Sequence, residues 1–328
     1  MATADQVKAL IKSHAEGDET RFYAIAMQMA AQEARTGHTR LAQELRLLVD
    51  ELRARSVREY PSESKLVPLA QPRGELAGLL TVGYSKTRLS EMALDAEVQR
   101  RIERVLVEQR ERARIQEHGF TPLRKLLLVG PPGTGKTMTA SVLAGELGLP
   151  LFTIQLHALI TKFMGETAAK LRLVFDAVAQ GRAVYLFDEF DAIGSDRASK
   201  NDVGEIRRVL NSFLQFLEQD ASDSLILAAT NHPALLDRAL FRRFDETIEF
   251  RLPAADAAER VMKGRLALLD TASVSWGEAT AAAAGLSHGD VVRACEQAAK
   301  NVLLAHRRGI DTATLVEALA DRRAAHGP

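Results

Sequence analysis

The feature that most constrains this chain is a glycine-rich octapeptide, Gly130-Pro131-Pro132-Gly133-Thr134-Gly135-Lys136-Thr137. It follows an apolar run, 125–129, that predicts a buried strand, and it precedes residues with helical spacing. Glycines let backbone N–H groups turn toward phosphate oxygens, and the start of the following helix adds partial positive charge. The octapeptide therefore predicts a phosphate-binding loop between a strand and a helix.

Individual side chains of the octapeptide have expected roles. Lys136 would reach the β and γ phosphates of a nucleotide, and the Thr137 hydroxyl would bind Mg²⁺. Further contacts to the nucleotide are expected from neighbouring positions, namely Pro132, Gly133, Thr134, Gly135 and Met138. These assignments make a nucleotide with magnesium the predicted ligand.

Two other apolar runs end in polar residues that suit the same chemistry. Asp188 and Glu189 follow the run 184–187. There Asp188 can complete the Mg²⁺ shell, and Glu189 can orient or deprotonate an attacking water. Asn231 follows the run 225–230 and either contacts the γ-phosphate or the water, or simply occupies a turn.

Two adjacent arginines, Arg242 and Arg243, precede the apolar run 246–250. Read alone, they are either surface charge or residues that stabilise phosphoryl transfer in a neighbouring molecule. The dipeptide by itself does not separate these interpretations.

The order of the apolar runs predicts an α/β fold. Helical segments separate five such runs, which favours a five-stranded parallel sheet with helices on both faces. The runs are 125–129, 151–155, 183–187, 225–229 and 246–250. We expect an N-terminal docking domain of three helices, a linker, the α/β nucleotide-binding domain and a C-terminal helical lid. Their expected bounds are 1–58, 59–83, 84–252 and 253–328.

The composition disfavours several classes of protein. Lys plus Arg and Asp plus Glu both total 43, a balance that argues against a nucleic-acid coat or a polybasic membrane protein. In the charged helical stretch 89–118, arginines are interleaved with glutamates and should pair with them. The only cysteine is Cys295, and no run approaches the roughly 18 apolar residues of a membrane span. We therefore expect a cytoplasmic protein.

In their order and spacing, these motifs resemble the AAA family of ATPases over residues 84–325. The resemblance includes the Walker A loop, the Walker B acids, sensor 1 and the arginine fingers. It implies that ATP is the nucleotide, that Asn231 is sensor 1, and that Arg242 and Arg243 serve the nucleotide of the neighbouring subunit. It also implies a ring, usually a hexamer, with ATP at the subunit interfaces.

A further segment, Lys162-Phe163-Met164-Gly165, resembles the pore loop of AAA unfoldases and of katanin- or spastin-type remodellers. In a ring, copies of Phe163 and Met164 would line a channel and grip varied polypeptide by packing. The charge of Lys162 disfavours the alternative, a Phe-Met pair in the core. Residues 195–204 would form a second pore loop.

The lid carries a turn, Gly285-Leu286-Ser287-His288-Gly289-Asp290, that resembles the adenine-contacting turn of the family. Gly289 permits close approach to the nucleotide, whereas His288 replaces a small residue and either stacks on the base or points away. On the following helix, Arg293 is expected at the surface and Cys295 in the core.

The predicted function is ATP-driven remodelling, unfolding or threading of a protein client by a ring. One alternative is a signalling or scaffold ATPase whose nucleotide state controls a partner, for example a protease. Another is a nucleic-acid loader, which the charge balance disfavours. The sequence contains no His-Glu-x-x-His motif, so proteolysis would need a separate partner. The chain is also similar to bacterial ATPases encoded beside subtilisin-like proteases.

Overall fold

The computed structural model describes residues 72, 74–159, 164–191, 203–236 and 238–325, all within one compact unit, Ala70–Pro328. The helices expected over 1–58 lie outside the described residues. Within the described part, no helix has the length and hydropathy that a membrane span requires. In chain order the elements are η1 (Gly74–Gly78), β1 (Leu80–Gly83), η2 (Leu89–Glu91), α4 (Ala96–Arg110), α5 (Arg112–Glu117), β2 (Lys125–Val129), α6 (Lys136–Leu147), β3 (Leu151–Ile154), α7 (Leu156–Leu159), α8 (Met164–Gln180), β4 (Val184–Phe187), α10 (Val203–Gln219), β5 (Leu225–Thr230), η3 (Pro233–Leu235), α11 (Arg238–Phe241), β6 (Glu246–Glu249), α12 (Ala255–Arg265), β7 (Asp270–Ser273), α13 (Trp276–Ala283), α14 (His288–Leu304), β8 (Gly309–Asp311) and α15 (Thr312–Ala325).

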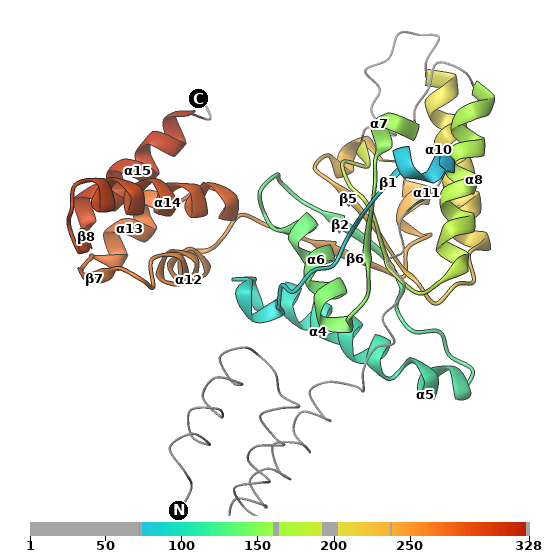
Figure 1. The fold of residues 1–328 in the computed structure, drawn as a ribbon, viewed down its shortest axis with the longest axis horizontal. Helices are drawn as coiled ribbons and strands as arrows, with labels where there is room; N and C mark the ends of the chain where they lie inside the picture. The colour runs from blue at the N-terminus through green and yellow to red at the C-terminus, as the bar shows by residue number, and fades with distance from the viewer. Residues whose placement is uncertain (1–71, 73, 160–163, 192–202, 237, 326–328) are drawn as a thin grey trace, which may run out of the picture. The chain divides into compact units, whose positions relative to one another are not determined.

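A six-stranded sheet, in the order β1-β3-β4-β5-β2-β6, forms the centre of the α/β part (Figure 1). The five expected strands are all present and pair in parallel, which confirms the α/β prediction. The additional strand, β1, pairs antiparallel with β3 at the edge of the sheet. The expected linker 59–83 therefore ends before β1. Four residues have too short a pattern to predict a strand, which forms here because β3 offers an unpaired edge.

Helices cover both faces of this sheet, and alternate residues of each central strand point to opposite faces. On one face, Leu127 and Phe187 pack with residues of α8 and α10. On the other face, Leu126 and Leu186 pack with residues of α4 and α6. Phe213 of α10 joins the first face, with its ring centroid 5.0 Å from that of Phe187. The uninterrupted apolar runs in the sequence thus reflect burial on two sides.

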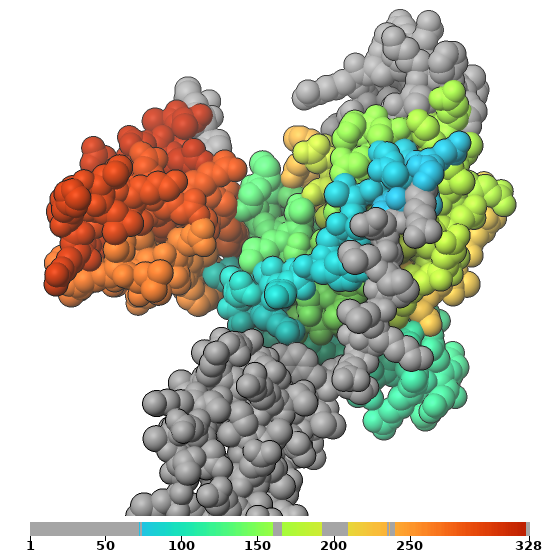
Figure 2. Space-filling model, viewed as in Figure 1, coloured from blue at the N-terminus to red at the C-terminus, as the bar shows by residue number. Residues whose placement is uncertain are grey.

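The C-terminal residues 255–325 build a core of their own. Figure 1 shows α12–α15 gathered in a bundle, and Figure 2 shows their side chains, coloured orange to red, filling a rounded body. Besides the four helices, this part contains two short strands that the sequence does not predict, β7 and β8, which pair in parallel. Such short extended segments become strands only when packing sets them side by side. Gly309 permits this approach, since a Cβ there would lie 3.1 Å from the carbonyl oxygen of Asp270.

Three expectations about helices are confirmed. Arg293 on α14 is exposed. Cys295 on the same helix is fully buried, and burial raises the pKa of its thiol to about 12. On α4, Arg101 pairs with Glu97 one turn away at 2.8 Å. Helical spacing predicted the burial of Cys295 and the pairing on α4, because it decides which face of a helix each residue occupies.

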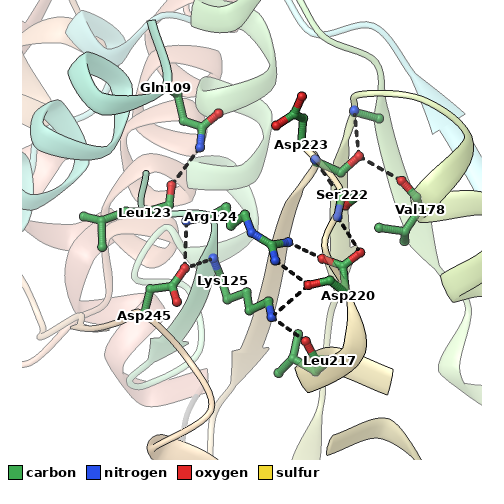
Figure 3. A network of polar contacts seen from close by, with 12 residues as sticks. Gln109, Leu123, Arg124, Lys125, Val178, Leu217, Asp220, Ser222, Asp223 and Asp245 are labelled. Atoms are coloured by element: carbon green, nitrogen blue, oxygen red, sulfur yellow. Dashed lines mark hydrogen bonds and ion pairs between the residues drawn. The ribbon is translucent and has the colours of Figure 1, made fainter. Parts of the chain in front are cut away.

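A polar network lies at the start of β2, at the end of the strand opposite to the octapeptide (Figure 3). Arg124 donates to the carboxylate and to the backbone carbonyl of Asp220. Lys125 donates from Nζ to the carbonyl oxygen of Leu217, and burial lowers the pKa of this ammonium. Asp245 Oδ2 accepts the backbone N–H groups of Arg124 and Lys125 at 2.9 and 2.8 Å. Arg124 and Lys125 therefore lie at the start of a buried strand with hydrogen-bond partners for their charged groups.

Candidate functional site

Three strand ends meet at one edge of the sheet. The strands β4, β5 and β2 are neighbours in that order. Their carboxyl ends lead into residues 188–189, Asn231 and the octapeptide 130–137, called the phosphate loop below. Ligands of open parallel sheets bind at the carboxyl ends of the strands. The fold therefore brings together predicted site residues that are distant in the sequence.

The phosphate loop follows a course that requires glycine. Gly130 and Gly133 have φ values of 146° and 73°, and Gly135 has a φ of 105° immediately before α6. A Cβ on Gly130 would lie 2.2 Å from the carbonyl oxygen of Phe250, and one on Gly133 would lie 2.4 Å from Ser287 Oγ. Both the backbone angles and these close approaches exclude other residues without rearrangement.

Lys136 is the first residue of α6, and its ammonium lies against the phosphate loop. Its Nζ donates to the carbonyl oxygens of Gly130 and Pro131, both at 2.7 Å. Burial lowers the pKa of Lys136, and the negative charges of Asp188 and Asp191 act in the opposite direction. The charge is thus held beside the loop by groups that a phosphate can displace.

The remaining expected contacts also lie on the loop and on the first turn of α6. Thr134 is buried, and its hydroxyl donates to the carbonyl oxygen of Pro131 at 2.8 Å. Pro132 and Gly133 are exposed, as is Met138 on α6. Thr134 therefore stabilises the loop, while the neighbouring residues remain accessible to a ligand.

Thr137 and Asp188 lie side by side. The hydroxyl of Thr137 donates to Asp188 Oδ2 at 2.7 Å, across the gap between α6 and the end of β4. Magnesium prefers oxygen ligands and usually binds one or two protein side chains together with substrate phosphates and waters. A hydroxyl and a carboxylate held next to the phosphate loop fit that donor set.

The backbone turns sharply at Glu189. Its φ is 51°, a left-handed conformation that is uncommon for residues other than glycine. Its N–H donates to Asp188 Oδ1 at 2.9 Å, and its side chain is exposed. Strained residues of this kind cluster at functional sites, which agrees with the catalytic role expected for Glu189.

Asp191 is a site residue that the motifs do not indicate. Its Oδ1 accepts hydrogen bonds from Thr230 Oγ1 at 3.1 Å and from the backbone N–H of Asn231 at 3.2 Å. The available signal is its place three residues after Asp188, close behind a strand end. That signal does not reveal the contact with β5, which depends on strand order.

The two candidate finger residues, Arg242 and Arg243, lie in the exposed turn between α11 and β6. Arg243 forms an ion pair with Glu218 of α10. Among the residues that the structure describes, no hydrogen bond or ion pair joins either arginine to the phosphate loop. Within one subunit, then, these arginines are not assembled with the other predicted site residues.

The lid turn 287–290 contacts the phosphate loop directly. The N–H of Gly289 donates to the carbonyl oxygen of Gly133 at 2.9 Å. His288 Nε2 lies 3.0 Å from the carbonyl oxygen of Ala93, so the imidazole points at the segment before α4. Burial lowers the pKa of His288, which favours a neutral ring that donates from Nε2.

The predicted pore loops fall largely in chain that is not described. Lys162 and Phe163 lie outside the described residues, as does 195–202. Met164 and Gly165 are the first two residues of α8. The proposed pore role therefore rests on the sequence.

Comparisons with known proteins agree with this geometry. Residues 126–252 match the model of the family described as ATPase family associated with various cellular activities (AAA). An uncharacterized AAA family ATPase of Sinorhizobium fredii, y4kL, is 31% identical over 98% of this chain and 96% of its own length. The ATP-dependent zinc metalloprotease FtsH 3 of Sphaerobacter thermophilus is 34% identical over 74% of this chain. The alignment spans 50% of that relative's length. The crystal structure of the FIGL-1 AAA domain matches 74% of this chain and 85% of its own, with a TM-score of 0.60 and 22% identity, and so supports the fold.

Proposed function

Because this chain belongs to the AAA family of ATPases and hydrolyses ATP, we propose that it works as a ring of identical subunits that remodels a protein client. The resemblance implies six subunits. The observation that carries the proposal is the strand edge where Lys136, Glu189 and the Thr137–Asp188 pair meet. A cytoplasmic location is part of the proposal and rests on the single cysteine.

Each side chain at this edge has a proposed task. Lys136 binds the β and γ phosphates, whose oxygens replace the loop carbonyls as partners of its ammonium. Glu189 orients or deprotonates the attacking water, and Asn231 hydrogen-bonds the γ-phosphate or that water. Thr137 and Asp188 would hold Mg²⁺, which neutralises phosphate charge when it is bound.

The arginines support action between subunits. Arg242 and Arg243 are exposed, and Arg243 is paired with Glu218 on the surface. The same turn of a neighbouring copy, set against the phosphate loop, would supply positive charge to the transition state. In other phosphoryl-transfer enzymes such an arginine is worth about 10³–10⁵ in rate. We therefore propose that each subunit completes the site of its neighbour.

The client is proposed to be a polypeptide that Phe163 and Met164 grip. This proposal is supported by the pore-loop resemblance and by the relationship to FtsH 3, a protein named as an ATP-dependent protease. Any proteolysis would need a separate partner, because this sequence has no His-Glu-x-x-His motif. The scaffold alternative predicts that Phe163→Ala leaves function intact.

Mixing experiments test the site and the ring together. Glu189→Gln should bind ATP but hydrolyse it roughly 10²–10⁴ times more slowly. Lys136→Ala should lose ATP binding, and Arg242→Ala should bind ATP without turnover. A mixture of Lys136→Ala with Arg242→Ala should regain activity, since an intact arginine then faces an intact loop. If neither Arg242→Ala nor Arg243→Ala is rescued in such a mixture, action across an interface is contradicted.

A trapping experiment tests the client. Tagged Glu189→Gln, held with ATP in lysate of the source organism, should retain a discrete protein identifiable by mass spectrometry. Phe163→Ala on the same background is the control and should lose that protein. A partner retained by both variants would contradict gripping by Phe163 and would favour docking on the N-terminal residues. Recovery of nucleic acid alone would favour the loader.

A further inference from the structure

Asp191 joins two strand ends that the catalytic motifs leave separate. It follows β4 and the strained Glu189, yet its carboxylate contacts the end of β5. One oxygen, Oδ1, accepts from Thr230 Oγ1 at 3.1 Å and from the backbone N–H of Asn231 at 3.2 Å. The same carboxylate oxygen therefore holds the last residue of β5 and the residue after it.

The segment that carries Asp191 is itself anchored. The N–H of Phe190 donates to the carbonyl oxygen of Ala229 at 2.8 Å, which ties this segment to β5. The Phe190 side chain is fully buried, with its ring centroid 4.6 Å from that of Phe213. Because the preceding residue is fixed by a backbone bond and by packing, the Asp191 carboxylate has a defined position relative to β5.

The Thr230 hydroxyl extends the arrangement past Asn231. It donates to Asp191 and accepts the N–H of His232 at 3.0 Å. Thr230 is fully buried, so this hydroxyl has little competition from water. The backbone of Asn231 is thereby held at its own N–H by Asp191 and at the next N–H by Thr230. A backbone fixed on both sides limits the directions that the Asn231 amide can take.

The location also adjoins the phosphate loop, because the backbone N–H of Gly130 donates to the carbonyl oxygen of Thr230 at 3.3 Å. The negative charge of Asp191 acts on the Lys136 ammonium, together with that of Asp188. Asp188 is already bound to Thr137 and to the N–H of Glu189. Asp191 has its own pair of donors, one on the last residue of β5 and one on the residue after it, so the two carboxylates serve different groups.

We infer that Asp191 is a positioning residue for ATP hydrolysis, which fixes the backbone of Asn231 so that its side-chain amide is presented to the γ-phosphate. The inference rests on the proposed role of Asn231. Asp191 acts through hydrogen-bond acceptance at Oδ1, and its charge is secondary. When a group that orients the reaction is displaced by about 1 Å, the rate can fall up to about 100-fold.

Two substitutions separate the acceptor from the charge. Asp191→Asn keeps an acceptor oxygen at the same distance from the backbone and removes the charge, so kcat should stay within about threefold of wild type. Asp191→Glu keeps the charge but moves the oxygens by one methylene, so kcat should fall roughly 10- to 100-fold with KM for ATP nearly unchanged. An inactive Asp191→Asn beside an active Asp191→Glu would overturn the inference.

A double-mutant cycle with Asn231 tests the route. Asp191→Ala should lower kcat roughly 10- to 100-fold in the wild type but less than about twofold in the Asn231→Ala background. An equal loss in both backgrounds would overturn the inference. A wild-type kcat for Asn231→Ala alone would instead reject the proposed role of Asn231. If Asp191→Ala fails to fold, the Asn and Glu variants still decide the question.

A matched control removes a carboxylate elsewhere. Asp223→Ala deletes an aspartate whose partners, Arg112 and Gln116, are near the amino ends of the strands. Its kcat should match that of the wild type. A comparable loss of kcat in this control would overturn the inference, because removal of any carboxylate would then slow the enzyme.

Discussion

Removal of the Asp220 carboxylate should destabilise the protein strongly without slowing catalysis. The side chains of Asp220 and Arg124 are only 5% and 10% exposed. Asp220→Ala therefore leaves a buried guanidinium without its counter-charge, a loss that costs about 3–5 kcal/mol of the free energy of unfolding. In domains of roughly this size each kcal/mol corresponds to roughly 2–4 °C, so Tm should fall by roughly 6–20 °C.

Asp223 on the same loop provides the matched control. It pairs with Arg112, and the two side chains are 49% and 33% exposed. An exposed pair contributes about 0–1 kcal/mol, so Asp223→Ala should lower Tm by at most roughly 4 °C. Both aspartates lie near the amino end of β5, away from the phosphate loop at the carboxyl ends. The folded fraction of either variant should retain the wild-type kcat.

Urea unfolding followed by circular dichroism measures the difference, because the midpoint shifts while the m-value stays constant. The double variant Arg124→Met/Asp220→Leu removes both charges and should recover much of the stability lost by Asp220→Ala. Equal losses for Asp220→Ala and Asp223→Ala would refute the argument from burial. A double variant as unstable as Asp220→Ala would show that the unpaired charge was not the cause.

Three further predictions concern the phosphate loop and the lid. Gly133→Ala forces an L-residue to a φ of 73° with its Cβ 2.4 Å from Ser287 Oγ. The resulting strain of about 1–2 kcal/mol should weaken ATP binding roughly tenfold, as measured by calorimetry. A wild-type affinity for ATP would contradict the close contact. Burial lowers the pKa of His288, so the unfolded chain takes up a proton at higher pH than the folded chain. The free energy of unfolding should therefore decrease as pH falls below about 6.5, and His288→Gln should lack that component in urea titrations at pH 7.5 and 5.5. The Cys295 thiol has a pKa raised to about 12, so alkylation by iodoacetamide at pH 8 should be slow in the folded protein and fast in urea; rapid labelling without urea would contradict its burial.

Much of the core could be predicted from sequence because its signals are local. All five residues of β2 and all six of β5 are buried, as their continuous apolar runs indicate. The phosphate loop could also be predicted, because glycines at 130, 133 and 135 indicate backbone angles that other residues avoid. The edge strand β1 and the pair β7–β8 were not predictable. Each has only three or four residues and depends on a partner strand that is distant in the chain.

The sequence by itself determined the α/β class, the phosphate loop and the acidic residues after β4, because composition and spacing along the chain encode them. Only the tertiary structure decided which strand ends meet. The order β4-β5-β2 places Asp191 against Asn231, and the lid turn places Gly289 against Gly133. These contacts join residues whose separation in the sequence carries no periodic signal, so they follow from packing of whole elements rather than from any local pattern.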